Sequence, residues 1–419
     1  MDVLIIGSRG REHALAMQLK KDPRVETIFC LPGNGGLVNI AKCIKMDLYD
    51  FDGIVEFLDA NPSIELTIVN PDELLSLGLV DLLNKKGHRA FGCSAACAQM
   101  EASKEFANTL CKKYNIPSPN FKVFDNYNKA KKYAKTQPLP LVVKTNGRTA
   151  GKGIMFCKNI YEAENAMYDM MEAKLFGEAG DKVDIEEFVS GKNMIVMCFT
   201  DGKTVVPLPA VQNYKRVYDD NLGLNTAGMG ATMPVEGYTK EIEKEVYEKI
   251  LVPTINALAS EGTPYKGVLG FNLIATDDGV KVVDFVARFC DVESQVLIPQ
   301  LETPILDIFN ACIDGTLDKI NVKIKNESAV CVVTVSGGYP LDYVKNFKIT
   351  IGNISNDIFV FHSGTKFVDG ELKTAGGRVL SLACFGPTKE QCADEVYKNI
   401  QKVSFDGMHY RKDIRGKKD

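Results

Sequence analysis

The sequence predicts an α/β protein of several domains, whose N-terminal part is a doubly wound parallel sheet. The chain has 419 residues, of which 45% are apolar and 25% charged, so it can bury the cores of two to four domains. Its first hundred residues alternate short apolar runs with helical patterns, which is typical of a parallel sheet covered on both faces. Asn115-Ile-Pro-Ser-Pro119 then marks a domain edge, because proline disfavours helix before it.

The elements of the N-terminal part follow from its apolar pattern. Strands are expected at Val3–Ile6, Ile28–Leu31, Leu66–Val69 and Ala90–Phe91, and helices at Glu12–Lys20 and Leu74–Lys85.

The middle of the chain is expected to be rich in strands. We expect strands at Phe121–Phe124, Leu141–Lys144, Ile154–Cys157, Asp184–Val189, Met194–Thr200 and Thr204–Leu208, and helices at Lys129–Lys135 and Glu241–Ser260. Thr276-Asp-Asp-Gly279 joins the apolar runs Val268–Ala275 and Val280–Val286, which predicts a hairpin. From about Ala329 a small α+β domain is expected, with strands at Val330–Val335 and Arg378–Phe385 and a helix from Thr388.

Composition excludes several classes of protein. Lysine and arginine total 50 against 54 acidic residues, so the formal charge of −4 gives no general attraction to nucleic acid or anionic membrane. The sequence has no apolar run long enough to predict a spanning helix, and its start lacks the pattern of a signal peptide. The 12 cysteines include no C-x-x-C pair and only 4 histidines accompany them, so we expect reduced thiols in a cytoplasmic protein and no zinc site.

Two glycine-rich loops follow the first two predicted strands. Gly7-Ser-Arg-Gly10 opens a helix, where backbone N–H groups favour anions such as phosphate, and Pro32-Gly-Asn-Gly-Gly36 lies at the neighbouring strand end. The spacing is not G-x-G-x-x-G, and no acidic residue ends a second strand at the expected distance, which disfavours a nicotinamide cofactor. A tight turn without a ligand is the alternative.

A third glycine-rich loop carries the strongest local signal. Lys144 ends a strand, and the loop up to Gly153 contains Lys152. Small residues let backbone amides approach triphosphate oxygens, and the lysines add positive charge. The loop is not a Walker P-loop, because a strand rather than a helix follows. An ordinary hairpin loop is the alternative.

Polar side chains also occur where packing does not explain them. Glu186 and Glu187 lie on an apolar strand, and Asp284 lies on another. A carboxylate on a buried strand is uncommon unless it is paired or bound to metal. Further polar positions lie at Gln212–Arg216, Asn225–Gly230, Arg288, Asp291 and Glu293.

These motifs resemble those of the phosphoribosylamine–glycine ligase (glycinamide ribonucleotide synthetase) family, which belongs to the ATP-grasp superfamily. The resemblance covers nearly the whole chain. It rests on IIGSRGREHA, PGNGG, QMEASK, VVKTNGRTAGKG, IEEFVSG, NYKR, LNTAGMGA, RFCDVESQ, SGGYP, FHSGT and GGRVL.

The resemblance implies three domains and one reaction. The expected domains are an N-terminal α/β domain at 1–101, an ATP-grasp region at 102–325 with a small lid sub-domain at about 120–190, and a C-terminal domain at 326–419. The implied reaction is the ATP-dependent ligation of glycine to 5-phosphoribosylamine through glycyl phosphate. It gives glycinamide ribonucleotide, ADP and phosphate, in purine biosynthesis.

The resemblance also implies roles for particular residues. Arg288 is the candidate to stabilise the transferring phosphate. ATP is expected to contact Lys104, Lys144, Gly151, Lys152, Gly153, Glu186, Glu187, Val189 and Asn193, with the loop at 147–153 closing over its phosphates. The two other substrates are expected to contact Gly10, Arg11, Glu12, Asn34, Gly35, Asn213, Lys215, Asn225, Thr226, Asp291 and Glu293.

The expected metal site departs from the family pattern. The family has glutamate and asparagine two residues apart as magnesium ligands, whereas this chain has Asp284 and Val286. Valine cannot bind a cation that requires oxygen. Asn272, on the partner strand of the predicted hairpin, is the candidate to replace the missing oxygen, and an exposed polar residue is the alternative. The chain also differs from the family pattern at four other places. They are Asn213, Tyr214, Asn193 and Asn70-Pro71.

Three functions stay open at this point. The first is the active ligase, using ATP and Mg²⁺ or Mn²⁺. The second is a carboxylate–amine ligase with another acid substrate. The third is an ATP-binding but catalytically silent regulatory or scaffold protein. A cytoplasmic monomer with small-molecule substrates, and with neither nucleic acid nor membrane as a partner, is expected.

Overall fold

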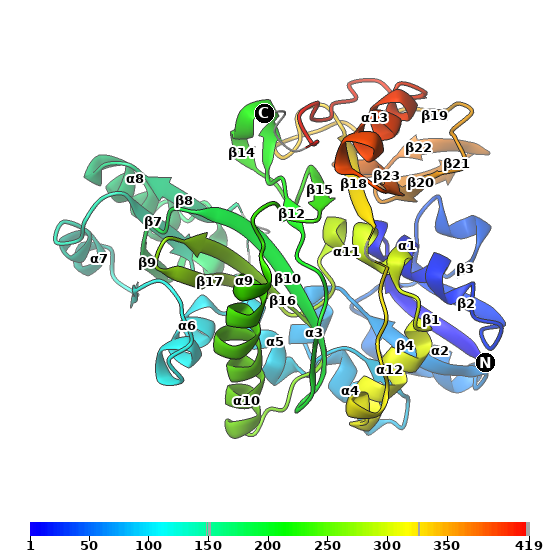
Figure 1. Ribbon diagram of the computed structural model, residues 1–419, viewed down its shortest axis with the longest axis horizontal. Helices are drawn as coiled ribbons and strands as arrows, with labels where there is room; N and C mark the ends of the chain where they lie inside the picture. Colours follow the sequence, from blue (N-terminus) through cyan, green and yellow to red (C-terminus); the bar gives the residue numbers. More distant parts are fainter. Residues whose placement is uncertain (148, 150–151, 326, 416–419) are drawn as a thin grey trace.

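The computed structural model describes residues 1–147, 149, 152–325 and 327–415. Its N-terminal part is one parallel sheet of strand order β3-β2-β1-β4-β5 (Figure 1, blue). Along β1, Val3 and Ile5 pack in one hydrophobic cluster and Leu4 and Ile6 in another. The sheet is therefore buried on both faces, which confirms the doubly wound prediction.

The elements of this part have the following bounds. The strands are β1 (Asp2–Gly7), β2 (Thr27–Pro32), β3 (Lys42–Cys43), β4 (Ile64–Val69) and β5 (Ala90–Phe91). The helices are α1 (Gly10–Leu19), α2 (Phe51–Ala60), α3 (Asp72–Ser76), α4 (Leu79–Lys85) and α5 (Ala95–Ala102).

Two predicted helices differ from the structure. The helix expected at Leu74–Lys85 is divided between α3 and α4, because Gly78 has a φ of +87°, which ends a right-handed helix. The segment expected at Glu241–Ser260 is helical, but a π-helical turn (Tyr247–Leu251) separates α9 (Lys240–Val246) from α10 (Val252–Ser260).

A small four-stranded antiparallel sheet lies at the left of Figure 1. Its strand order is β6-β9-β7-β8, and its buried residues form a hydrophobic cluster of their own. We call residues 121–187 the small sub-domain. Its elements are β6 (Phe121–Phe124), α7 (Tyr127–Ala134), β7 (Leu141–Thr145), β8 (Ile154–Cys157), α8 (Ile160–Met171) and β9 (Val183–Glu187), and α6 (Lys104–Lys113) precedes it.

The next sheet, of order β11-β10-β16-β17, is antiparallel. Its strands are β10 (Lys192–Asp201), β11 (Val205–Pro207), β16 (Lys266–Thr276) and β17 (Gly279–Val286). The hairpin of β16 and β17 turns at 276–279, as the sequence predicts, and its register places Asn272 opposite Asp284.

The C-terminal sheet draws strands from two distant parts of the chain. Its order is β12-β15-β18-β23-β20, in which β12 (Gln212–Asn213) and β15 (Gly230–Met233) precede the other strands by about a hundred residues. Hydrogen bonds between β15 and β18 (Ser328–Val335) therefore connect the residues before the boundary expected at 325/326 to those after it.

The remaining helices and strands have the following bounds. They are β13 (Arg216–Tyr218), β14 (Leu222–Asn225), α11 (Asp291–Leu297), α12 (Ile305–Asp314), β19 (Thr350–Ile351), β20 (Ile358–His362), β21 (Thr365–Val368), β22 (Glu371–Thr374), β23 (Arg378–Gly386), α13 (Lys389–Ile400) and β24 (Val403–Ser404).

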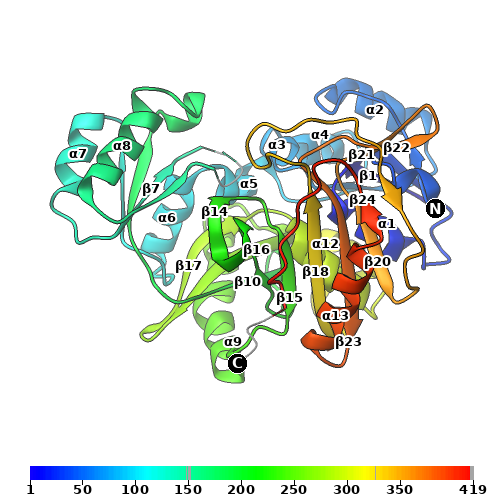
Figure 2. The same cartoon turned by 90° about the horizontal axis from the view of Figure 1, so that it is seen from above.

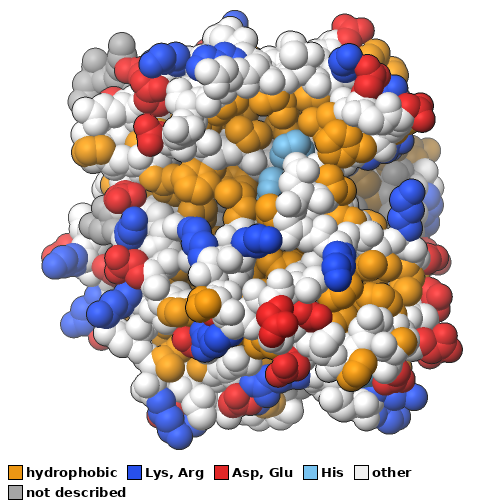
Figure 3. Space-filling view, turned by 90° about the vertical axis from the view of Figure 1, so that its right-hand side faces the viewer, with side chains coloured by type: hydrophobic (Ala, Val, Ile, Leu, Met, Phe, Trp, Pro, Cys, Tyr) orange, Lys and Arg blue, Asp and Glu red, His pale blue; other side chains and the backbone are white. Residues whose placement is uncertain are grey.

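The N-terminal and C-terminal parts meet between α1 and β20, and both lie to the right in Figure 2. The backbone N–H of His362 donates to Nδ1 of His13 over 2.9 Å, and the two rings have centroids 5.5 Å apart. Figure 3 shows the right-hand side of the molecule, where histidine side chains lie among hydrophobic ones. Within the described residues, the structure has no helix with the length and apolar character needed to cross a membrane.

Candidate active site

A cavity of about 590 Å³ lies where the N-terminal part, the small sub-domain, the sheet of β10, β16 and β17, and the C-terminal sheet meet. The end of β1 and the start of α1 line it from the N-terminal part, and Thr145 and Gly147 line it from the small sub-domain. Strands β10, β16 and β17 and the start of α11 also contribute to its wall. A site with walls on several domains can bind more than one substrate side by side. We call this space the main cavity.

Two lysines surround the carboxylate of Asp284 in the main cavity. Asp284 lies on β17 and forms an ion pair with Lys104, the first residue of α6. Burial disfavours the charged carboxylate, but the charges of Lys104 and Lys144 lower the pKa of Asp284. Asp284 is therefore ionised at neutral pH and able to bind a cation.

Lys144 is buried between the small sub-domain and β17. Its Nζ lies 2.5 Å from Oε2 of Glu186 and donates to the backbone oxygen of Val283 over 3.0 Å. Burial disfavours the ammonium group, but Glu186 and then Asp284 raise its pKa. Burial and the charge of Glu186 raise the pKa of the neighbouring Asp184 to about 8. The acidic residues Glu186 and Asp284 thus stabilise the charge of Lys144 at the contact between the sheet of the small sub-domain and β17.

Asn272 and Asp284, the two candidate metal ligands, lie opposite each other on β16 and β17. Oδ1 of Asn272 accepts from Nζ of Lys215 over 2.8 Å, and Val286 offers no side-chain oxygen. In the part of the chain that the structure describes, no group of three or more His, Cys, Asp or Glu side chains could hold a metal ion. Mg²⁺ usually keeps several waters and takes substrate phosphates with one or two protein carboxylates. A carboxylate and an amide oxygen fit such a site.

Arg288 is held by two carboxylates. Its Nη2 donates to Glu101 over 2.8 Å, and its Nε lies 3.4 Å from Oδ1 of Asp72. Burial disfavours the charged guanidinium, but Glu101 and Asp72 raise its pKa above the ordinary value. Arg288 therefore brings a permanent positive charge to the wall of the main cavity.

The start of α11 also lines the main cavity. Nδ2 of Asn213 donates to Oε1 of Glu293, and burial raises the pKa of Glu293. Asp291 pairs with Arg378 over 2.6 Å, and the charges of Arg378 and Arg11 outweigh its burial and lower its pKa to about 2. The start of α11 therefore brings to the cavity an ionised acid, Asp291, and an acid with a raised pKa, Glu293.

The glycine-rich loops of the N-terminal part contact the C-terminal part. Asn34 Nδ2 donates to the backbone oxygens of Ser8 and His362 over 2.9 and 2.8 Å, and the N–H of Gly35 donates to Thr365. The N–H of Gly10 donates to Ser363 over 2.9 Å. The loops thus form the joint between the two parts, in addition to any contact with a ligand.

Three family models match the chain in succession. They are the N domain of phosphoribosylglycinamide synthetase over residues 1–101, its ATP-grasp (A) domain over 102–294 and its C domain over 329–417. The chain belongs to this family. It is 39% identical to the phosphoribosylamine–glycine ligase of Caldanaerobacter subterraneus subsp. tengcongensis over 99% of each chain. It is also 39% identical to that of Vibrio parahaemolyticus, over 99% of this chain and 97% of the relative.

Solved structures agree with this assignment. The phosphoribosylamine–glycine ligase of Thermotoga maritima has a TM-score of 0.84 at 28% identity, over 99% of this chain and 100% of that one. The biotin carboxylase domain of the Hydrogenobacter thermophilus 2-oxoglutarate carboxylase, solved with MgADP and bicarbonate, has a TM-score of 0.74 at 15% identity. It covers 98% of this chain and 91% of its own, and it shares the fold alone.

The main cavity of this family member brings together many of the residues predicted from the sequence. Those that line it are Lys104, Arg11, Asn213, Lys215, Asn225, Thr226, Asn272, Asp284, Arg288, Asp291 and Glu293. Those that do not line it are Gly10, Glu12, Asn34, Gly35, Lys144, Lys152, Gly153, Glu186, Glu187, Val189 and Asn193. Lys152 lines a second cavity, and Gly151 lies outside the described residues.

Several lining residues were not predicted from the sequence. They are Arg9, Tyr49, Asp72, Glu101 and Arg378. Glu101 and Arg378 stand inside the quoted motifs QMEASK and GGRVL, so a motif-wide prediction would have included them. For Asp72 no such signal exists, because its part in the site depends on a salt bridge to Arg288, 216 positions later in the sequence.

Proposed function

We propose that this protein is an ATP-dependent ligase that joins glycine to 5-phosphoribosylamine. The observation that carries the proposal is the main cavity. One continuous space holds Lys104 and Asp284 at one part of its wall, and Arg11, Asp291 and Glu293 at another. A ligase of this kind must bring a triphosphate, a carboxylic acid and an amine into one space.

The proposed reaction has two steps. The carboxylate of glycine attacks the γ-phosphorus of ATP, which releases ADP and gives glycyl phosphate. The amine of 5-phosphoribosylamine then attacks the acyl carbon, which releases phosphate and gives glycinamide ribonucleotide. A carboxylate oxygen is already nucleophilic, so the first step needs alignment and charge neutralisation rather than a general base.

The charged residues of the site suit these steps. Lys104 and Lys144 are proposed to contact phosphates, and Arg288 to stabilise the phosphoryl group during transfer. Asp284 and Asn272 are proposed to hold Mg²⁺, or Mn²⁺ in its place. When bound, this ion neutralises phosphate charge. Glu293, in the cavity with Asn213, is proposed to contact the amine.

The test is a reconstituted assay with purified protein. Continuous ADP release should require Mg²⁺, ATP and glycine together with an acceptor amine, and with phosphoribosylamine as that amine mass spectrometry should identify glycinamide ribonucleotide. With hydroxylamine in place of phosphoribosylamine, glycine hydroxamate should form, because hydroxylamine traps an acyl phosphate. Absence of ADP release under all these conditions would refute the proposal.

A specific observation favours the silent ATP-binding protein as a second candidate. Lysines hold both candidate metal ligands, and Val286 removes a third oxygen. ATP binding by calorimetry without any turnover would select this alternative. For the other ligase, with a different acid, turnover with another small amino acid in place of glycine would be decisive.

The remaining predictions about partners stay with this proposal. The substrates are small molecules, and the working unit is proposed to be a cytoplasmic monomer without a nucleic-acid partner. Light scattering during size-exclusion chromatography tests the oligomeric state.

A further inference from the structure

One hairpin brings three polar side chains to the main cavity, those of Lys215, Asn225 and Thr226. Its strands, β13 and β14, pair with each other in a sheet of two strands. We call residues 214–226 the hairpin segment. Nζ of Lys215 donates to Oδ1 of Asn272 over 2.8 Å, which brings its charge to a candidate metal ligand. The position of the hairpin segment therefore determines where this ammonium group lies in the cavity.

Pairing between β13 and β14 is not enough to fix this position. Residues 222–224 of β14 are exposed, so no second layer covers this strand. A two-stranded hairpin without a covering layer is marginally stable in water. The hairpin segment must therefore be held by contacts with other parts of the chain.

Residues 409–414, which we call the tail segment, supply these contacts. Nη1 of Arg411 donates to the backbone oxygen of Arg216 over 3.1 Å, and its guanidinium lies 5.1 Å from the ring centroid of Tyr214. Arg411 thus contacts the residue on each side of Lys215. Further hydrogen bonds between the two segments join Arg411 to Asn221, His409 to Val217, Lys412 to Asp219 and Asp413 to Asp220.

The surroundings of Arg411 fix its guanidinium in one orientation. Its side chain is 0% exposed, and Asp413 accepts from Nε over 2.8 Å and from Nη2 over 2.6 Å. This bidentate pair sets the plane of the guanidinium and leaves Nη1 for the hairpin segment. Helix α13 holds the backbone, because the hydroxyl of Tyr397 donates to the backbone oxygen of Arg411 and accepts from the N–H of Ile414. The tail segment is therefore a firm support for the hairpin segment.

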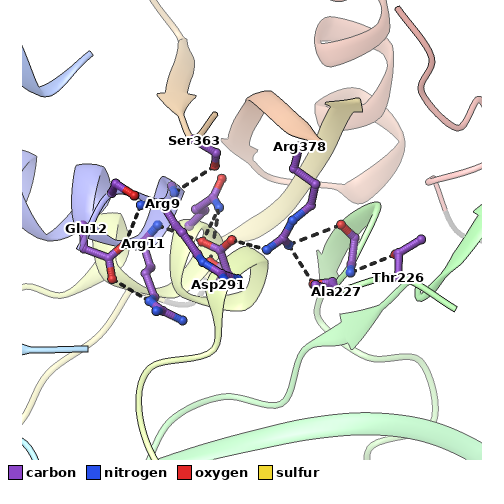
Figure 4. A network of polar contacts seen from close by, with 12 residues as sticks. Arg9, Arg11, Glu12, Thr226, Ala227, Asp291, Ser363 and Arg378 are labelled. Carbon is purple, nitrogen blue, oxygen red and sulfur yellow. Dashed lines mark hydrogen bonds and ion pairs between the residues drawn. The ribbon is translucent and has the colours of Figure 1, made fainter. Parts of the chain in front are cut away.

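The base of the hairpin segment is held from β23. Figure 4 shows Arg378 directed towards Asp291 and towards the backbone of Ala227, with Thr226 beside it. Nη1 of Arg378 donates to the backbone oxygen of Ala227 over 2.7 Å. The hydroxyl of Thr226 donates to the backbone oxygen of Lys215 over 2.8 Å, which closes the base. The end at Thr226 thus has its own support, whereas the residues on each side of Lys215 depend on Arg411.

We propose that Arg411 is a positioning residue of the main cavity, which holds Tyr214 and Arg216 and so directs Lys215 towards Asn272. Arg411 does not line the main cavity, so its effect must pass through the hairpin segment. The assignment rests on the proposed function for the reaction that Lys215 serves. Its effect on ATP binding can be measured without that reaction.

The first experiment measures binding of ATP, with Mg²⁺ present, to the full chain by calorimetry. Lys215→Gln and Arg411→Gln should each weaken ATP binding about tenfold or more, which is the scale of a charge-assisted contact. The double variant should bind ATP no more weakly than Lys215→Gln alone, because Arg411 acts through Lys215. Arg411→Lys should recover only part of the affinity, because an ammonium group cannot form the bidentate pair with Asp413.

The matched control is Arg415→Gln. Arg415 follows the tail segment directly and pairs with Asp394 of α13 instead of the hairpin segment. This variant should bind ATP as wild type does.

Hydrogen exchange separates positioning from a general loss of structure. In Arg411→Gln the N–H groups of Thr226 and Met229, which donate to Lys215 and Tyr214, should exchange faster. Those between β18 and β23 should stay protected. If Arg411→Gln does not fold, Asn221→Ala removes one acceptor of Arg411 at an exposed residue. It should cause the same exchange pattern and weaken ATP binding about threefold, the scale of one ordinary hydrogen bond.

Two binding results would overturn the proposal. One is an ATP affinity equal to that of wild type in folded Arg411→Gln, or in Asn221→Ala if Arg411→Gln does not fold. The other is additive losses in the double variant, which would show that Arg411 acts independently of Lys215.

The second experiment uses the reaction itself. Arg411→Gln should change kcat and the KM for ATP in the same ratio as Lys215→Gln does, because one variant displaces the group that the other removes. A lower kcat with the wild-type KM for ATP in Arg411→Gln, where Lys215→Gln raises that KM, would contradict the proposal. If wild type ligates nothing, yet the losses of ATP affinity are not additive, the proposed function fails and the role of Arg411 stands.

Discussion

Individual lysines hold the oxygen atoms that are proposed as metal ligands. Lys104 pairs with Asp284, and Lys215 donates to Asn272. A lysine released from such a pair can turn to a phosphate, and the released oxygen can bind the accompanying cation. Exchange of partners at single residues is therefore a simple way for this site to receive a metal–nucleotide complex.

The first residue-scale prediction concerns the metal ligands. Asp284→Asn should abolish activity, because it removes the carboxylate among the candidate ligands. Val286→Asn should keep activity and lower the Mg²⁺ concentration needed for half-maximal rate, because it adds an oxygen ligand. Magnesium titrations of the initial rate measure both effects. Full activity in Asp284→Asn would remove Asp284 from the metal site.

The second residue-scale prediction concerns Lys144. Lys144→Ala should weaken ATP binding by about 2 kcal/mol, or roughly thirtyfold in Kd, because it removes a desolvated charge partner of phosphate. It should also destabilise the fold, since it leaves Glu186 buried beside Asp184 without its cation. Calorimetry and urea unfolding separate the two effects, and Lys113→Ala, at an exposed pair with Glu261, is the control. Unchanged ATP affinity would exclude Lys144 from the site.

At the scale of elements, the contact between α1 and β20 includes two histidines, of which His13 is buried and His362 is half-buried. Burial and His362 lower the pKa of His13 to about 3, and burial lowers that of His362 to about 4. An unfolded histidine titrates near 6.5, so below that pH the unfolded chain takes up protons that the folded chain does not. The joint between the N-terminal and C-terminal parts is therefore sensitive to acid.

The corresponding prediction is a loss of stability between pH 6.5 and about 4. The slope should be about 1.4 kcal/mol per pH unit for each histidine, and these two residues should add no slope above pH 7. His13→Asn keeps an oxygen that can accept from the N–H of His362 and should remove one histidine's share of the slope. Urea unfolding at a series of pH values measures this. An equal slope in the variant would show that His13 does not contribute.

At the scale of the whole molecule, the hydrophobic clusters divide the chain unevenly. The small sub-domain has a separate cluster, whereas the cluster that contains β18 and β23 also includes residues of β1, α1 and β15. The two ends of the small sub-domain also lie together, since Phe121 pairs with Glu186. Among the described residues, the small sub-domain is therefore the part that is built as a separable unit.

This division leads to a paired deletion experiment. Replacement of residues 121–186 by a short glycine linker should leave a folded protein that no longer binds ATP. Deletion of 327–415 should prevent folding, because it strips β15 of its partner β18 and opens the shared cluster. Circular dichroism and urea unfolding compare the two proteins. A cooperative transition in the second and none in the first would reverse this view.

By itself the sequence determined the local elements and the chemistry of the motifs. Strands such as β1 and the hairpin of β16 and β17 are predictable, because apolar runs and turn residues act over a few positions. The family followed from motifs spread over nearly the whole chain, and with it many of the charged residues that line the main cavity, although Arg9, Asp72, Glu101 and Arg378 were not among them.

Only the tertiary structure decided which of these side chains meet. Lys104 and Asp284 are 180 positions apart, and Gly10 and Ser363 are 353 apart. Such contacts depend on how domains pack, which no local pattern encodes. For the same reason the sequence indicated the amides at the start of α1 as an anion site, whereas packing against the C-terminal part and against α11 gives the amides of Gly10 and Arg11 to the side chains of Ser363 and Asp291.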